Sequence, residues 1–162
     1  MTRLRTRFLL ATTLGILVSM VSQISVAQSL RGLKTVTILV EALSQDEADC
    51  GVTTDALRTA VEYVLQQSRL RTVNNVGDGQ GYLYLQVSAL PSSQVCAGSI
   101  TMSFRTVVQG NTPYGQIQNI VEVYSKNTVL LGPTGNFGKL VNEQVETLTK
   151  MFVVVWAKDN PL

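Results

Sequence analysis

The chain has 162 residues, of which 45% are hydrophobic and 15% are charged, and its formal net charge is +2. It contains no histidine, which excludes Ser-His-Asp and Cys-His catalytic sets, histidine-ligated zinc and an imidazole base near neutral pH. The basic excess does not indicate nucleic-acid binding, because it comes from Arg3, Arg5 and Arg7 at the N-terminus. Without these three, ten basic residues face eleven acidic ones, and no basic face of the kind that binds nucleic acid is expected.

The first 27 residues have the layout of a secretory signal peptide. The three arginines precede an uncharged, largely apolar run over residues 8–24, and Ser25 and Ala27 place small residues three and one before a cut after Ala27. We therefore expect a signal peptide over residues 1–27, a single domain over residues 28–162, and a periplasmic or secreted product. A retained membrane anchor is the alternative, since the apolar run is long for a signal peptide.

The mature chain holds two cysteines, Cys50 and Cys96. An even number of cysteines in an exported chain predicts a disulfide bond. Free or metal-binding thiols are the alternative, but two distant cysteines without histidine make a poor ligand set. We expect no metal and no cofactor.

The pattern of the first half of the mature chain predicts a strand, a loop and a helix. Residues 34–43 alternate apolar and polar side chains, which is typical of a half-buried strand. The acidic segment 44–51 is expected to be a solvated loop. Thr53 or Thr54 can cap a helix over residues 55–70, which carries one apolar stripe.

The second half is richer in strands. A short strand is expected over residues 70–73, and alternating patterns predict longer strands over 82–90, 99–108 and 120–131. The loop between the last two strands is placed at residues 109–116, and the last strand is expected to be bulged or folded at Lys126-Asn127. Apolar residues at helical spacing predict a final helix over residues 136–158.

The glycine-rich run LLGPTGNFGKL, over residues 130–140, invites comparison with a phosphate-binding loop. A Walker loop needs four residues between its first glycine and a Gly-Lys-Ser/Thr sequence. Here five residues separate Gly132 from Gly138, and Lys139 is followed by Leu140. We interpret the run as a sharp turn from strand to helix, where glycine supplies positive φ.

These elements predict an α+β fold. Each clear strand has one apolar side, which favours a two-layer sandwich with a mostly antiparallel sheet of four to five strands and two helices on one face. The expected order is β-α-(β)-β-β-β-α. In this layout Cys50, Cys96 and the glycine run lie at the same end of the sheet.

The strand, the LRTAVEYVLQQSRLRTV helix and the YLYLQVSAL strand together resemble small bacterial envelope domains. These include the N-terminal domain of the Tol translocation protein TolB and the lipopolysaccharide-assembly lipoprotein LptE. The resemblance rests on element order and hydrophobic spacing over about residues 34–156, with no diagnostic motif. It implies an envelope or periplasmic location and a binding role, and it transfers no functional residue. The chain lacks the lipid-bearing cysteine of the lipoproteins.

The candidate partner surface is the wet face of the sheet. Exposed aromatic side chains beside an arginine can bind a partner, and the residues expected there are Tyr82, Tyr84, Thr101, Arg105 and Tyr124. Ordinary cross-strand packing is the alternative for these aromatics. A second candidate surface is formed by the loops at the disulfide end, residues 45–49, 92–95 and 134–137.

Three functions compete. We expect a non-catalytic exported protein that binds another envelope protein or a polymer, with no nucleic-acid partner and no membrane contact other than a retained anchor. A carrier of a small ligand or lipid, with a cavity between helices and sheet, is the alternative. A hydrolase using Glu41, Asp46 or Asp49 is disfavoured, because an exposed loop gives these carboxylates ordinary acidity.

Overall fold

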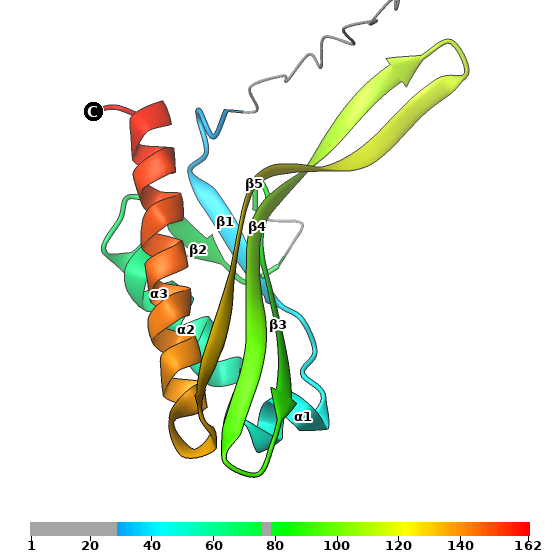
Figure 1. Ribbon diagram of the computed structural model, residues 1–162. Helices are drawn as coiled ribbons and strands as arrows, with labels where there is room; N and C mark the ends of the chain where they lie inside the picture. The colour runs from blue at the N-terminus through cyan, green and yellow to red at the C-terminus, as the bar shows by residue number, and fades with distance from the viewer. Residues whose placement is uncertain (1–28, 76–78) are drawn as a thin grey trace, which may run out of the picture.

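The computed structural model describes residues 29–75 and 79–162 (Figure 1). The expected signal peptide, residues 1–27, lies outside the described residues. Along the chain the elements are β1 (Thr35–Val40), α1 (Gln45–Asp49), α2 (Thr54–Gln66), β2 (Arg71–Val73), β3 (Tyr82–Pro91), β4 (Val95–Thr112), β5 (Gly115–Pro133) and α3 (Thr134–Asp159).

The five strands form one mixed sheet in the order β2-β1-β3-β4-β5. Strand β1 lies parallel to β2 and to β3, whereas β3, β4 and β5 are joined antiparallel. The expectation of a mostly antiparallel sheet is therefore correct only for the last three strands. The reason is the return of the chain through α2, because a helical crossover brings the next strand back in the same direction.

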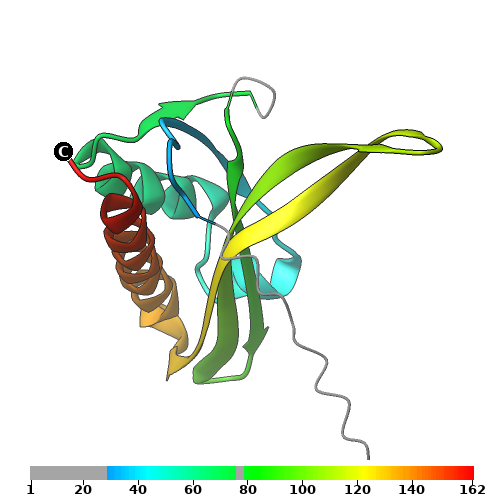
Figure 2. The ribbon, with the colours of Figure 1, turned by 90° about the horizontal axis from the view of Figure 1, so that it is seen from above.

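Helices α2 and α3 pack side by side against one face of the sheet, as predicted (Figures 1 and 2). Thr53 caps α2, accepting a hydrogen bond from the Ala56 amide at 3.3 Å. The apolar stripe of α3 is buried between the layers, and its largest fully buried side chains are Phe137, Val141, Val145 and Phe152. From the sheet they meet Leu83, Leu85, Ile100 and Met102, which are also buried.

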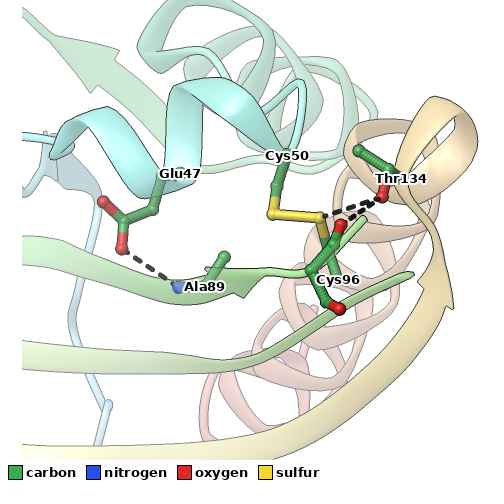
Figure 3. Close-up of a disulfide and its surroundings, with 6 residues drawn as sticks. Glu47, Cys50, Ala89, Cys96 and Thr134 are labelled. Atoms are coloured by element: carbon green, nitrogen blue, oxygen red, sulfur yellow. Dashed lines mark hydrogen bonds between the residues drawn. A yellow bond between two sulfur atoms is a disulfide. The ribbon is translucent and has the colours of Figure 1, made fainter. Parts of the chain in front are cut away.

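The acidic segment expected as a loop contains the short helix α1. Glu47 holds this helix in place: one carboxylate oxygen accepts hydrogen bonds from the backbone amide and hydroxyl of Ser44, and the other accepts from the Ala89 amide at 3.0 Å (Figure 3). The hydrogen bond from the Ser44 side chain is the main cause that lowers the pKa of Glu47. Through these hydrogen bonds, Glu47 links α1 to the end of β3.

The structure joins Cys50 and Cys96 in the predicted disulfide, with their Cα atoms 6.0 Å apart (Figure 3). Both cysteines are fully buried. The bond ties the end of α1 to the start of β4, next to Thr134 at the start of α3. As predicted, the cysteines and the glycine-rich run lie at one end of the sheet.

The glycines of that run do not supply the positive φ expected of a turn; they allow close packing. Among the described residues, positive φ occurs at Gly32, Gly51 and Gly115, and not in the run. Gly138 lies inside α3, where an added Cβ would meet the carbonyl oxygen of Gly51 at 2.1 Å. Close approach of α3 to the disulfide end therefore requires glycine at position 138.

The β4–β5 hairpin is much longer than the sequence pattern predicts. Its pairing continues through the expected loop 109–116 to Thr112 and Gly115, with Pro113 and Tyr114 at the turn. A register shift between Phe104 and Arg105 bends the hairpin away from the body of the molecule (Figures 1 and 2). The distortion expected at Lys126-Asn127 is absent from the described pairing, which is regular there.

Candidate binding surfaces

The part of the hairpin beyond the sheet, residues 107–120, is hereafter called the arm. Pairing between β3 and β4 ends at Tyr82 and Arg105, so the two strands of the arm pair only with each other among the described residues. Residues 107–120 read VVQGNTPYGQIQNI and contain no charged side chain. The arm is thus a two-stranded projection without a core of its own.

Apolar side chains are exposed on both faces of the arm. Val107 and Ile120 are directly opposite each other on one face, and they are 52% and 64% exposed. Val108 and Ile117 lie on the other face and are 48% and 46% exposed, and Tyr114 at the tip is 99% exposed. Exposed aliphatic residues on two faces are unusual for a solvated hairpin and typical of a contact surface.

The outer edges of the arm are open along both strands. Among the described residues, β5 is the last strand of the sheet, and β4 pairs only with β5 after Arg105. Natural edge strands are usually blunted by lysine, proline or a bulge. Within the arm, charge is absent, proline occurs only at Pro113 in the turn, and the pairing is regular.

Side-chain contacts fix the base of the arm to the body. Arg105 forms an ion pair with Glu122 at 3.4 Å and lies over the ring of Tyr84 at 4.3 Å. The hydroxyl of Thr106 donates a hydrogen bond to the carbonyl of Gln80 at 2.8 Å. These contacts set the direction in which the arm leaves the sheet.

Two of the expected partner-surface residues, Tyr84 and Arg105, are therefore in contact on the wet face. The neighbouring Glu41 carboxylate, which accepts a hydrogen bond from the hydroxyl, is the main cause that raises the pKa of Tyr84. Thr101 lies on the same face, half-buried, four positions before Arg105 on β4. The contacts indicate cross-strand packing at the base of the arm.

The other two expected residues are not exposed. Tyr82 lies on this face but is only 8% exposed. The placement of Tyr124 on the wet face is wrong: it pairs with Phe104, packs edge-on against Phe152 and belongs to the core. The bulge is the reason, because Val123 is skipped in the pairing and every side chain before it changes face relative to those after it.

The disulfide end carries a second exposed apolar area, on the wet face of the sheet. Leu90 on β3 and Val129 and Leu131 on β5 are each more than 70% exposed, and Leu90 and Leu131 lie in register on either side of Ala97 of β4. Beside them a shallow cavity of about 470 Å³ is bordered by Asp46 and Ala89. Of the disulfide-end loops expected as a surface, residues 45–49 form α1 and residues 134–137 form the first turn of α3.

The described residues contain no metal-ligating cluster and no helix that could span a membrane, and side chains fill the space between the helices and the sheet. Within 29–75 and 79–162, no three His, Cys, Asp or Glu side chains are grouped to hold a metal ion. In the same ranges, no helix is long and apolar enough to cross a membrane. The space between the helices and the sheet is filled by fully buried side chains such as Phe137, Phe152 and Met102.

No family model and no curated protein matches the sequence. Among solved structures, a minor lipoprotein from Acinetobacter baumannii aligns with a TM-score of 0.39 and 12% identity, covering 79% of this chain and 94% of that one. The solution structure of an uncharacterized lipoprotein B from Nitrosomonas europaea aligns with a TM-score of 0.32 and 9% identity, covering 76% of this chain and 81% of that one. Both are bacterial lipoproteins, and at this level of likeness they assign no role to any residue here.

Proposed function

We propose that this protein is an exported, non-catalytic component of the bacterial envelope that binds a partner protein through its arm. The observation that carries the proposal is the uncharged, two-sided apolar arm, which projects from a body that does not need it for a core (Figure 2). The signal-peptide layout of residues 1–27 supports export.

The chemistry of the arm favours a polypeptide partner over a polymer of sugars. An open strand edge presents a row of backbone donors and acceptors, which an extended segment of another protein matches by adding a strand. Val107, Val108, Ile117 and Ile120 then supply apolar contacts on both sides of the added strand. Spanning a bilayer is disfavoured for a two-stranded ribbon, because its open edges would leave backbone groups unpaired in hydrocarbon.

The test is a shortened arm. Replacing residues 107–120 with Asn-Gly joins Thr106 to Val121, which already face each other in the hairpin, by a two-residue turn. We expect the exported protein to recover a defined partner from envelope extract and the shortened variant to lose at least about 90% of that recovery, equivalent to about 1.4 kcal/mol or more of binding free energy.

A matched control changes the wet face outside the arm. Leu90→Ser and Val129→Ser remove exposed apolar side chains at the disulfide end and should leave recovery of the partner unchanged. Equal loss in the control, or full recovery with the shortened arm, would contradict the proposal. Recovery of a glycan through an intact arm would support the polymer alternative instead.

A further inference from the structure

The end of the molecule opposite the disulfide is basic. Five exposed Lys and Arg residues lie there, on the N-terminal lead-in, just before and at the start of β2, and near the end of α3: Arg31, Lys34, Arg69, Arg71 and Lys158. Figure 1 shows the start of the described chain and the C-terminal end of α3 at this end, away from α1. Half of the ten basic residues after residue 28 therefore lie at one end.

Three of these side chains share one cleft. A cavity of about 460 Å³ is lined by Arg31, Lys34 and Arg69, with Trp156 and Asp159. Arg69 is held in place, because its guanidinium lies 5.4 Å from the centre of the Trp156 ring and donates to the carbonyl of Asn160 at 2.8 Å. The indole of Trp156 in turn donates to the carbonyl of Leu33 at 2.9 Å.

The one acidic side chain that lines this cleft is already engaged. Asp159 accepts hydrogen bonds from the Leu30 amide at 2.8 Å and from the Ser29 hydroxyl at 3.2 Å. At the disulfide end the balance is reversed, since Asp46, Asp49 and Asp55 are all exposed on α1 and the start of α2. A chain that is close to neutral after residue 28 is thus strongly asymmetric in charge.

We propose that the basic end docks on the surface of an anionic phospholipid bilayer, with lipid phosphates at the cleft. Clusters of Lys and Arg next to a membrane-inserted segment bind anionic lipids by electrostatic attraction. Where the apolar run over residues 8–24 is retained as an anchor, the alternative to cleavage after Ala27, it ends only a few residues before Ser29 and keeps the basic end near the bilayer. The exposed acids at the opposite end favour the same orientation.

The probe is a set of phosphatidylcholine vesicles prepared with or without phosphatidylglycerol. The protein used is residues 28–162, because the described part of this range contains the whole buried core. Trp156 is the single tryptophan of the chain, so energy transfer to a dansyl-labelled lipid reports docking at the cleft. We expect binding to the anionic vesicles only, weakened by salt because exposed charges are screened beyond about 8 Å at physiological ionic strength.

Two variants of equal charge decide whether the basic end is responsible. Combining Arg31→Gln, Lys34→Gln and Arg71→Gln should lower the affinity for anionic vesicles by about 100-fold at low salt, at about fivefold for each side chain. The control combines Lys126→Gln, Lys139→Gln and Lys150→Gln, which are exposed on β5 and α3, and should change the affinity by less than about threefold.

Four results would overturn the proposal: no binding to anionic vesicles, equal binding to neutral ones, an equal loss in the control variant, or displacement by millimolar glycerol phosphate. The last would indicate a small-anion site and not a membrane surface. Partner recovery through the arm is measured separately, so that either proposal can fail without the other.

Discussion

The body, which is the described structure outside residues 107–120, and the arm differ in how they pack: the body has a buried core, and the arm has none. In the body, every strand except the short edge strand β2 covers a buried layer, and the disulfide, Glu47 and Gly138 fix α1 and α3 against the sheet. In the arm, β4 and β5 continue with exposed apolar side chains on both faces, and no other described element packs against them. A hairpin alone is marginally stable in water. The comparison teaches that stability resides in the body, and that the arm is free to serve binding.

The largest expected loss of stability comes from removing the aromatic ring at the centre of the body. Phe152 is fully buried and packs against the rings of Phe104 and Tyr124, with centroids 5.7 and 5.3 Å away. Phe152→Ala should lower the free energy of unfolding by about 4 kcal/mol. Ile120→Ala in the arm should change it by less than about 0.5 kcal/mol. Urea denaturation measures both free energies of unfolding, and similar losses in the two variants would contradict the contrast between body and arm.

Removing the disulfide should cost slightly less. Cys50 and Cys96 are separated by 46 positions in the sequence, and chain entropy for a loop of this size corresponds to at most about 4 kcal/mol, with 2–4 kcal/mol typical. Cys50→Ala combined with Cys96→Ala should lower the free energy of unfolding by about 3 kcal/mol and leave the arm able to bind. An unchanged midpoint of denaturation would show that the bond does not brace the body.

Alanine substitutions at two glycines of α3 should change stability in opposite directions. Gly138→Ala places a Cβ 2.1 Å from the carbonyl oxygen of Gly51 and should cost about 2 kcal/mol through overpacking. Gly135→Ala, three residues earlier in the helix, meets nothing within 4 Å and should stabilise by about 0.5–1 kcal/mol. Thermal unfolding curves that shift in the same direction for both variants would contradict the packing role of Gly138.

The smallest effect concerns pH. The pKa of Glu47 is lowered in the folded state, so its carboxylate contributes stability above its ordinary pKa of 4.5, and that contribution is lost as the pH falls through the folded-state pKa. The stability difference between the unmodified protein and Glu47→Gln should therefore be largest at neutral pH and shrink below pH about 4.5. A difference that grows on acidification would refute this role.

Much of the body could be predicted from the sequence, because its elements carry clean periodic patterns. The stripe of α3, the alternation of β1 and β3 and the cap at Thr53 are local signals, and all are present in the structure. The even number of cysteines, together with the expected export, predicts the pairing of Cys50 with Cys96. The parallel pairing of β1 could not be derived in this way, because it depends on where the crossover through α2 returns the chain.

The sequence pattern does not predict the arm, and the reason is physical. Val107 and Val108 are adjacent, as are Ile120 and Val121, so apolar side chains point to both faces and the alternation that marks a half-buried strand is lost. The bulge at Val123 reverses the face of the residues before it relative to those after it, so simple alternation along the strand puts Tyr124 on the wrong face. Neighbouring apolar pairs flanking a Pro-Tyr-Gly turn are the signal that could have indicated a free hairpin.

The shortened arm tests the central claim most directly, when stability and partner recovery are measured on the same preparation. With residues 107–120 replaced by Asn-Gly, we expect a free energy of unfolding within about 1 kcal/mol of the original, together with loss of the partner recovered from envelope extract. A variant that is equally stable and still recovers the partner would contradict the assignment of binding to the arm. A variant that unfolds would contradict the separation of body and arm itself.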